Sequence, residues 1–218
     1  MKPSYSPPLM VAVRKMPLNG YTVISTFSGA GGSSLGLRMA GFKCLWANEF
    51  VQAAQEVYRQ NFPDTFLNPN DIRTITSEDI YRETGAKKGS IDLMEGSPPC
   101  SSFSTAGQKE KNWGKEKKYS TDKVQRTDDL FFEYTRLLRS IKPKMFVAEN
   151  VSGLVKGVSI GYFKEIMQEF ENAGYKVRAQ LLDAAWLGVP QKRQRLIFLG
   201  ARDDLGVEPE YPKPLPYQ

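Results

Sequence analysis

A cysteine and a glutamate stand where a thiol and a carboxyl group could act together. Cys100 follows the apolar run of residues 91–94 and two prolines, which end a strand and stiffen the turn that carries the thiol. Glu149 follows another apolar run, residues 146–148. Ligands of open α/β sheets bind outside the carboxyl ends of the strands, so neighbouring strands would bring both groups into one crevice.

Each of these groups also has an ordinary interpretation. A cysteine of a soluble protein is usually a buried thiol, and a glutamate at a strand end is often a solvated surface carboxyl. The prolines and the polar Ser101, Ser102 and Ser104 around Cys100 make a reactive thiol about as well supported as a buried one. These residues alone do not decide between the two.

Two arginines near the end of the sequence could serve the same site. Arg193 and Arg195 lie just before and at the start of the extended run of residues 195–201. Side chains two positions apart in a strand point the same way, so both guanidinium groups could face one ligand. They could equally bind a phosphate group or lie in solvent.

A glycine turn after the first predicted strand is typical of sites for nucleoside-containing cofactors. Gly29 and Gly31 lie in this turn, which leads into a helix whose N-terminus a ligand could approach. Glu49 ends the second predicted strand, 18 positions after Gly31 (49 − 31), near the spacing of about 20 expected for a ribose-binding acid. Alone this signal is weak, because a glycine turn is often only a turn.

The composition limits the available chemistry. The chain has 218 residues, of which 40% are hydrophobic and 25% charged, as expected for one soluble domain with a full core. It has no histidine, so Cys-His and Ser-His-Asp catalysis are excluded and proton transfer must fall to carboxylates, lysines or water. The net charge of +6 and the isoelectric point of about 9.2 are compatible with a polyanionic partner.

The two cysteines, Cys44 and Cys100, offer neither a disulfide framework nor the spacing of a zinc site, which suits a reducing compartment. Cys44 is predicted to fill the core. The longest apolar run near the start, residues 9–13, is too short for a signal peptide or a membrane span. We therefore expect a cytoplasmic or nucleoid-associated protein without a membrane partner.

Short strands alternate with helices of about ten residues, which predicts an α/β fold with a mostly parallel, doubly wound sheet. The last two strands, residues 175–183 and 195–201, have no full helix between them, so the last is expected to lie antiparallel near one edge. The other predicted strands cover residues 21–27, 43–48, 91–94 and 144–148, and the main predicted helices cover residues 35–40, 51–60, 77–84, 129–141 and 162–173.

A long segment, residues 105–127, interrupts this alternation. Between positions 109 and 126 it holds seven basic and three acidic residues, with Trp113 and Tyr119 among them. A loop this long inside a compact domain is usually functional or disordered. Placed just after Cys100, it could fold over a bound polyanion, with lysines on phosphates and aromatic rings near bases. A merely solvated basic loop is the alternative.

Six motifs resemble, in order and spacing, those of the cytosine carbon-5 DNA methyltransferases. The resemblance runs from about Tyr21 to Ala201, and its Pro-Cys, Glu-Asn-Val and Gln-x-Arg-x-Arg elements are together highly specific. It implies a Rossmann-like fold that uses S-adenosylmethionine. The motifs are Phe27-Ser28-Gly29-Ala30-Gly31-Gly32, Asn48-Glu49-Phe50, Asp71-Ile72, Gly96-Ser97-Pro98-Pro99-Cys100, Glu149-Asn150-Val151 and Gln191-Lys192-Arg193-Gln194-Arg195.

The resemblance also implies a reaction. In this family a thiolate adds to carbon 6 of cytosine, and the resulting enamine takes the methyl group at carbon 5. Cys100 would be that nucleophile, and Glu149 would contact ring nitrogen 3 and the amino group. Arg195 would bind the carbonyl oxygen of the base, with Arg193 supporting the site or a phosphate. The target base must be flipped out of the duplex, and the basic segment is the candidate for closing over it.

For the cofactor, the resemblance assigns Glu49 to the ribose hydroxyls and Asp71 to the adenine amino group. Gly29 and Gly31 would let the cofactor approach the backbone. The apolar walls would come from Phe27, Phe50, Ile72, Pro99 and Leu130.

The sequence departs from the family pattern in two places. Ser101 stands where a glutamine usually follows the catalytic cysteine, a change we expect to be tolerated. Family members also continue into a target recognition region and a final segment that completes the cofactor pocket, which this sequence lacks. We expect an extended lead-in over residues 1–20, a catalytic domain over residues 21–204 and a proline-rich tail or linker over residues 205–218.

Three explanations of the short length remain open at this stage: a fragment, one subunit of a split enzyme, or a degenerate copy that only binds cofactor or nucleic acid. In the second case another polypeptide would carry the target recognition region. The substrate is also open, because tRNA cytosine methyltransferases share these motifs with the enzymes that act on DNA.

Overall fold

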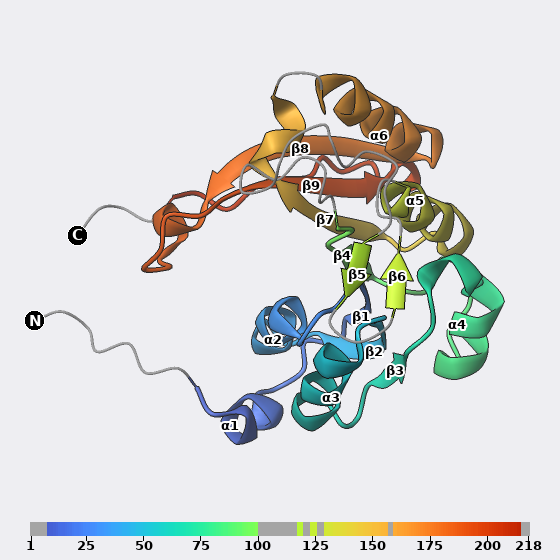
Figure 1. Cartoon of the computed structure of the whole chain (residues 1–218), viewed down its shortest axis with the longest axis vertical. Coiled ribbons are helices and arrows are strands. Elements are labelled where there is room, and N and C mark those ends of the chain that lie inside the picture. The colour runs from blue at the N-terminus through green and yellow to red at the C-terminus, as the bar shows by residue number, and fades with distance from the viewer. Residues whose placement is uncertain (1–7, 100–116, 120–122, 126–128, 157–158, 215–218) are drawn as a thin grey trace, which may run out of the picture.

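The computed structural model describes residues 8–99, 117–119, 123–125, 129–156 and 159–214. Within these ranges the main sheet has seven strands in the order β3-β2-β1-β4-β7-β9-β8 (Figure 1). Strand β9 is antiparallel to both neighbours, and the other pairs are parallel. The predicted fold class is therefore confirmed. The strands are β1 (Thr22–Thr26), β2 (Lys43–Asn48), β3 (Phe66–Asn68), β4 (Leu93–Gly96), β7 (Met145–Val151), β8 (Tyr175–Asp183) and β9 (Gln194–Arg202).

Helices cover both faces of this sheet, with α2 and α3 on one face and α4, α5 and α6 on the other (Figure 1). The chain builds outward from β1 to β3, then returns and builds outward in the opposite direction from β4. Right-handed crossovers therefore put the later helices on the second face. The helices are α2 (Gly32–Met39), α3 (Gln52–Asn61), α4 (Ser77–Thr84), α5 (Leu130–Ile141) and α6 (Ile160–Asn172), with short 3-10 turns η1 (Ile72–Thr74), η3 (Ser152–Val155), η5 (Ala184–Leu187) and η6 (Asp203–Leu205).

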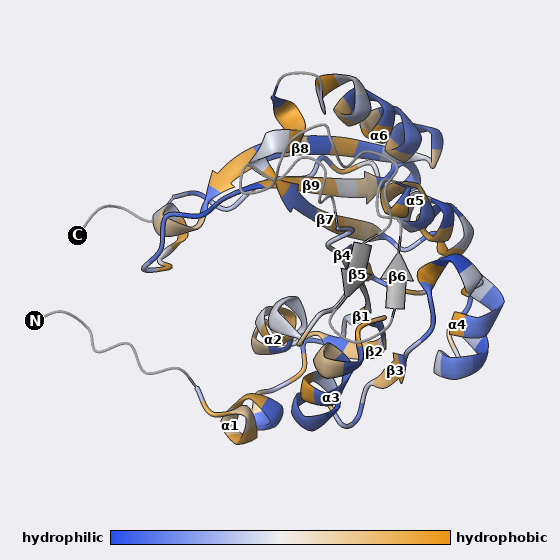
Figure 2. Ribbon diagram, in the orientation of Figure 1, coloured by the Kyte–Doolittle hydropathy of each residue, from blue (hydrophilic) through white to orange (hydrophobic). Residues whose placement is uncertain are grey.

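The largest part of the core lies between the sheet and the helices α5 and α6. These helices interleave hydrophobic and hydrophilic residues, so each can bury one side and expose the other (Figure 2). Phe131, Phe146, Phe170 and Phe198 meet there, each at most 2% exposed. The rings of Phe146 and Phe170 lie 4.4 Å apart between centroids. This packing joins helices α5 and α6 to the neighbouring strands β7 and β9.

The register between β4 and β7 matters for the site. Gly96 pairs with Ala148, so the residues after these two strands lie side by side. Gly96 also permits close packing, because a Cβ there would lie 2.3 Å from Thr26 Oγ1 and 2.7 Å from Tyr134 Cε2. Strands β4 and β7 are therefore neighbours, which is the condition under which the residues that follow them could share one crevice.

Two segments differ from the expectations. The lead-in is not extended throughout, because Met10–Lys15 form helix α1, which buries Val13. Arg14 explains its position: its guanidinium donates to the carbonyl oxygens of Gln60 and Asn61 at the end of α3, at 2.6–3.2 Å. In the long basic segment, β5 (Lys117–Tyr119) and β6 (Lys123–Gln125) form a two-stranded antiparallel ribbon.

None of the described helices is long and apolar enough to cross a membrane.

Candidate active site

A cavity of about 280 Å³ opens at the carboxyl ends of β1, β2 and β4, where the direction of strand order reverses. Ligands of doubly wound sheets bind at this switch point. Six of the nine predicted cofactor residues line the cavity: Phe27, Gly29, Glu49, Phe50, Ile72 and Pro99. Four further lining residues were not predicted: Asn48, Val51, Ala54 and Ser97.

Glu49 joins the two backbone segments that border this cavity. Its carboxylate accepts hydrogen bonds from the backbone N–H of Gly29 and from that of Val51, each at 2.7 Å. The residue is only 8% exposed. Glu49 therefore fixes the glycine turn against the start of α3, and each of its oxygens keeps a second lone pair for a ligand.

Gly31 supports the site without lining the cavity. It is the residue before α2 and has a φ of 95°, in the left-handed region. A Cβ at this position would lie 2.5 Å from Phe62 Cε2, so only glycine lets the turn lie this close to α3. Its role is packing of the turn rather than direct contact with the cavity.

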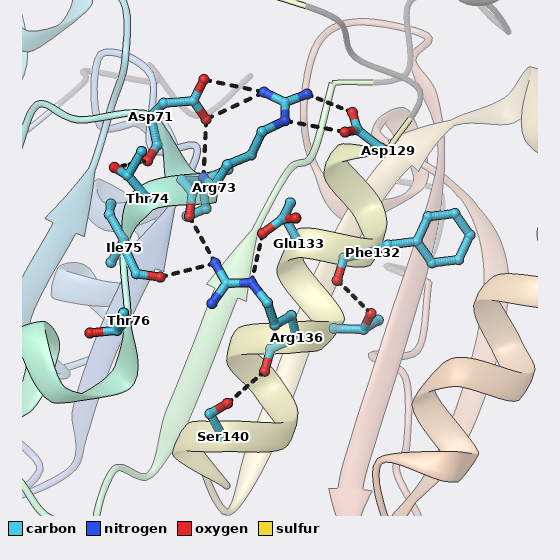
Figure 3. Close-up of polar contacts among 12 residues, drawn as sticks. Asp71, Arg73, Thr74, Ile75, Thr76, Asp129, Phe132, Glu133, Arg136 and Ser140 are labelled. Carbon is cyan, nitrogen blue, oxygen red and sulfur yellow. Dashed lines mark hydrogen bonds and ion pairs between the residues drawn. The ribbon is translucent and has the colours of Figure 1, made fainter.

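Asp71 and Leu130 also lie outside the cavity lining. Leu130 is fully buried in the core at the start of α5. Asp71 caps η1, accepting from the backbone N–H of Arg73 at 3.0 Å. The Arg73 guanidinium pairs with Asp71 at 3.2 Å and with Asp129 at 2.5 Å (Figure 3). This bridge connects the loop that carries Ile72 to the start of α5.

A second arginine strengthens the same connection. Arg136 of α5 donates to the carbonyl oxygens of Ile72 and Ile75, both at 2.9 Å, and pairs with Glu133 at 2.7 Å (Figure 3). The two arginines thus hold η1 against α5 on both sides of Ile72. The wall that Ile72 gives the cavity is fixed by charged hydrogen bonds rather than by burial alone.

Glu149 and Arg195 form an ion pair on the neighbouring strands β7 and β9, with Glu149 one position beyond the Ala148 that pairs with the last residue of β4. The Arg195 Nε lies 2.6 Å from Glu149 Oε1, and both side chains are partly exposed. Burial raises the pKa of Glu149, while the charges of Arg195 and Arg193 act in the opposite direction. Arg193 itself is exposed, and its backbone N–H donates to Asp183 at 3.1 Å.

Cys100 lies outside the described residues, and so does most of the basic segment that follows it. Pro99, the last described residue before it, lines the cavity. The turn that leads to it is held by Asn150, whose Nδ2 donates to the Pro98 carbonyl at 3.3 Å. Asn150 is 2% exposed, and its Oδ1 accepts from the N–H of Val151 at 2.8 Å. This link between β7 and the turn was not predicted, although Asn150 belongs to the Glu149-Asn150-Val151 motif.

Glu95 is a buried acid that the sequence reasoning missed. It lies in β4, is 5% exposed, and accepts a hydrogen bond from the Ser25 hydroxyl of β1. Burial raises its pKa to about 7, against the effect of the hydrogen bond from Ser25. The signal that could have revealed it is a carboxyl group inside an otherwise apolar strand.

Cys44 lies in β2, away from the cavity lining. Its Sγ is 3.6 Å from the Tyr58 hydroxyl and 3.5 Å from the Trp46 carbonyl oxygen. Burial raises the pKa of this thiol to about 11. Cys44 is only partly buried, is not among the buried core residues and lines a second cavity, so the prediction that it fills the core is not confirmed.

Comparison with known proteins gives one family. Residues 21–217 match the family model for C-5 cytosine-specific DNA methylases. The type II methyltransferase M1.HphI of Haemophilus parahaemolyticus is 37% identical over 193 residues, which cover 88% of this chain and 48% of that protein. M.NgoPII of Neisseria gonorrhoeae is 36% identical over 199 residues, covering 89% and 52%. The chain spans about half the length of the curated relatives it matches.

Solved structures agree with this. A prophage-encoded protein of E. coli, assigned as a DNA modification methyltransferase, superposes with a TM-score of 0.71 at 26% identity, over 88% of this chain and 49% of that one. DNMT2 of Spodoptera frugiperda shares the fold, with a TM-score of 0.65 at 23% identity over 85% and 51% of the two chains.

Proposed function

The chain belongs to the C-5 cytosine-specific DNA methylases, and on that basis we propose that it forms the catalytic half of an enzyme that methylates carbon 5 of cytosine in DNA, with S-adenosylmethionine as the methyl donor. The observation that supports the proposal most is that two features lie on adjacent strands of the sheet. The cavity bounded by Glu49 opens beside the turn that leads to Cys100, and the Glu149–Arg195 pair lies on the next strands.

The residues of the cavity fit S-adenosylmethionine. Phe27, Phe50 and Ile72 offer apolar walls suited to an adenine ring, and the Glu49 carboxylate can accept hydrogen bonds from two ribose hydroxyls. A cavity of about 280 Å³ lies near the lower end of ligand sites. When bound, S-adenosylmethionine supplies an electrophilic methyl group. Asp71, already fixed by Arg73, would accept from the adenine amino group.

The reaction at the base is carried out by residues of the protein. The Cys100 thiolate adds to carbon 6 of cytosine, and the electron pair of the 5,6 double bond becomes available at carbon 5 for the methyl group. Glu149 donates a proton or hydrogen bond to ring nitrogen 3, where negative charge develops, and its raised pKa favours this role. Arg195 binds the carbonyl oxygen. Loss of the carbon-5 proton to a base and elimination of the thiolate restore the aromatic ring.

Cys100 must be activated without a histidine, since the chain has none. Backbone dipoles of its turn and positively charged side chains are the means we propose for lowering its pKa. A measured thiol pKa close to the value of about 8.5 for a free cysteine would contradict this part of the mechanism. DNA, carrying a flipped cytosine, is the proposed partner, and the net charge of +6 favours it.

The test is methyl transfer from S-adenosylmethionine labelled in its methyl group to DNA of mixed sequence. The unchanged chain and Cys100→Ser are compared, each alone and with intact tRNA as a competing acceptor. Label recovered as 5-methylcytosine in DNA, from the unchanged chain only, would support the proposal. Preferential labelling of tRNA would replace the substrate. Binding of cofactor that survives Cys100→Ser, with no turnover by either form, would indicate a non-catalytic half.

A further inference from the structure

The side chain of Asn48 holds a loop of the cavity beyond the point where strand pairing ends. Asn48 is the last residue of β2 and is 2% exposed. Its Nδ2 donates to the carbonyl oxygen of Asn70 at 2.8 Å and to that of Asn68 at 3.1 Å. Asn70 lies two positions past the end of β3, outside the paired residues of β2 and β3. Asp71 and Ile72 follow it directly, so Asn48 fixes the start of the loop that carries them.

This arrangement leaves the oxygen of the Asn48 amide without a partner. Both carbonyl groups are acceptors, so the amide must turn Nδ2 toward them and Oδ1 away from them. Among the residues that the structure describes, none donates to Oδ1 of Asn48. In the same ranges, the one side-chain nitrogen or oxygen that lacks a partner and is cut off from solvent is Nη1 of Arg38. Oδ1 of Asn48 is therefore accessible.

The accessible oxygen belongs to the cavity, because Asn48 is one of the residues that line it. Among the described lining residues, only Asn48, Glu49 and Ser97 have polar side chains. An acceptor in such apolar surroundings is unfavourable unless a donor reaches it, and buried polar atoms without partners are rare. A ligand that donates a hydrogen bond to Oδ1 would account for this oxygen.

The nucleoside of the proposed cofactor has one donor for which no acceptor has been assigned. The two carboxylate oxygens of Glu49 suit the two ribose hydroxyls, and Asp71 suits one hydrogen of the adenine amino group. The amino group has a second hydrogen. Asn48 anchors the loop that carries Asp71, so it lies on the side of the cavity that is proposed for the adenine.

We propose that Asn48 is a specificity-determining residue of the cofactor site: its Nδ2 holds the loop before Asp71, and its Oδ1 accepts the second hydrogen of the adenine amino group. The inference rests on the proposed function, because the ligand is the proposed cofactor. Its consequence is discrimination against cofactors whose purine has no amino group at position 6.

The experiment measures dissociation constants of the whole chain by calorimetric titration with two ligands. These are S-adenosylhomocysteine and its analogue with hydrogen in place of the 6-amino group. The variant is Asn48→Ala, and Asn68→Ala is the matched control. Asn68 Oδ1 accepts from the N–H of Asn70 at 3.0 Å, so Asn68 supports the same loop, but it is not in the cavity lining. Thermal unfolding shows whether each variant is folded.

The quantity that decides is the ratio of the two dissociation constants. We expect the unchanged chain to bind S-adenosylhomocysteine at least about tenfold more tightly than the analogue, and Asn48→Ala to reduce this preference by about five- to tenfold, which corresponds to one hydrogen bond. Asn68→Ala should weaken both ligands alike and keep the preference of the unchanged chain. Disturbance of the loop would then be separated from loss of the contact with the amino group.

A second variant keeps the inference testable if Asn48→Ala does not fold. In Asp71→Ala the amino group retains Asn48 as an acceptor, so S-adenosylhomocysteine should still bind more tightly than the analogue. Equal binding of the two ligands by Asp71→Ala would overturn the inference.

The remaining outcomes separate the inference from the proposed function. If Asn48→Ala keeps the full preference of the unchanged chain, or if Asn68→Ala loses as much of it, Asn48 does not select the amino group and the proposed function stands. If the unchanged chain binds neither ligand, the proposed function is overturned and the inference with it.

Discussion

Glu149 is under two opposing influences, burial that raises its pKa and the nearby arginines that lower it. If it serves as the proton donor to the base, replacing it by glutamine should be costly for the reaction and nearly silent for cofactor binding. We predict that Glu149→Gln lowers the rate of methyl transfer by at least about 100-fold, as is usual for a lost acid–base group. Its dissociation constant for S-adenosylmethionine should change by less than about threefold.

Single-turnover methyl transfer and calorimetric titration together check this prediction. Glu56→Gln, the same chemical change on the exposed side of α3, serves as the control. A transfer rate for Glu149→Gln within threefold of the unchanged chain would show that the carboxyl has no part in the chemistry.

Glu95 should make the stability of the fold depend on pH. Its pKa is raised from 4.5 to about 7 in the folded chain, so between these values the unfolded chain releases the proton first. The free energy of unfolding therefore falls as pH rises, by up to about 3 kcal/mol from this group once pH exceeds 7. Glu95→Gln should remove this loss.

Urea denaturation at pH 5 and pH 8 is the measurement. The difference in free energy of unfolding between Glu95→Gln and the unchanged chain should grow in favour of the variant from the lower to the higher pH. A difference that stays constant would mean that the carboxyl is not buried as described.

The elements around the site depend on close contact between β4 and its neighbours. Gly96→Ala would place a methyl group against Thr26 and Tyr134, both buried. We predict a loss of about 1–3 kcal/mol in the free energy of unfolding, the usual result of overpacking. Gly161→Ala is the matched control, because a Cβ at Gly161 meets nothing within 4 Å. Chemical denaturation of both variants checks the prediction, and equal stability of the two would refute it.

The η1 turn should be sensitive to its arginine bridge. Arg73→Gln removes the ion pairs to Asp71 and Asp129, so the loop that carries Ile72 loses one of its two fixed links to α5. Because these side chains are partly exposed, we predict a change in stability below about 1 kcal/mol. Affinity for S-adenosylmethionine should fall by roughly three- to tenfold, about one charged hydrogen bond.

Titration calorimetry of Arg73→Gln beside Arg82→Gln tests this. Arg82 forms a comparable ion pair with Asp79 on α4, but its side chain is 68% exposed and far from the cavity lining. Equal affinities in the two variants would contradict the role given to the bridge.

The elements themselves were largely predictable, because each strand is a short apolar run and each helix has a clear end. The antiparallel β9 followed from the missing helix between β8 and β9, whereas the neighbouring positions of β4 and β7 were only a condition of the sequence argument. Helix α1 was not predictable, since its six residues bury only Val13 and depend on Arg14 reaching carbonyl groups 46 or more positions away. Contacts at such separation leave no local pattern.

At the scale of the whole molecule, some residues of the candidate site could be predicted from the sequence and others could not. Six of the nine residues that the motifs predict for the cofactor line the cavity, because glycine turns and acids at strand ends carry a local signal. The other three, Gly31, Asp71 and Leu130, are not in the lining: Gly31 packs against Phe62, Asp71 pairs with Arg73, and Leu130 is buried in the core. The cavity is also lined by Ser97, Val51 and Ala54. Their place in the lining depends on the register of the strands and not on residue type.

The molecule described here accounts for about half the length of its curated relatives. Its sheet has both the switch point and the β7–β9 pair, so the cavity and the Glu149–Arg195 pair belong to one sheet. The labelled transfer experiment tests methyl transfer and not the recognition of a DNA sequence.

The raised pKa of Cys44, and not its partial burial, is expected to make the chain behave as a single-thiol protein toward reagents. With a pKa of about 11, Cys44 is thiolate in only roughly one molecule in three thousand at pH 7.5, and its sulfur lies against Tyr58. We predict that iodoacetamide alkylates Cys100 alone in the folded chain, and that peptide mass spectrometry finds Cys44 modified only after denaturation. A fluorophore or spin label could then be placed at the proposed nucleophile without mutagenesis, and any label found on Cys44 would report that β2 had opened.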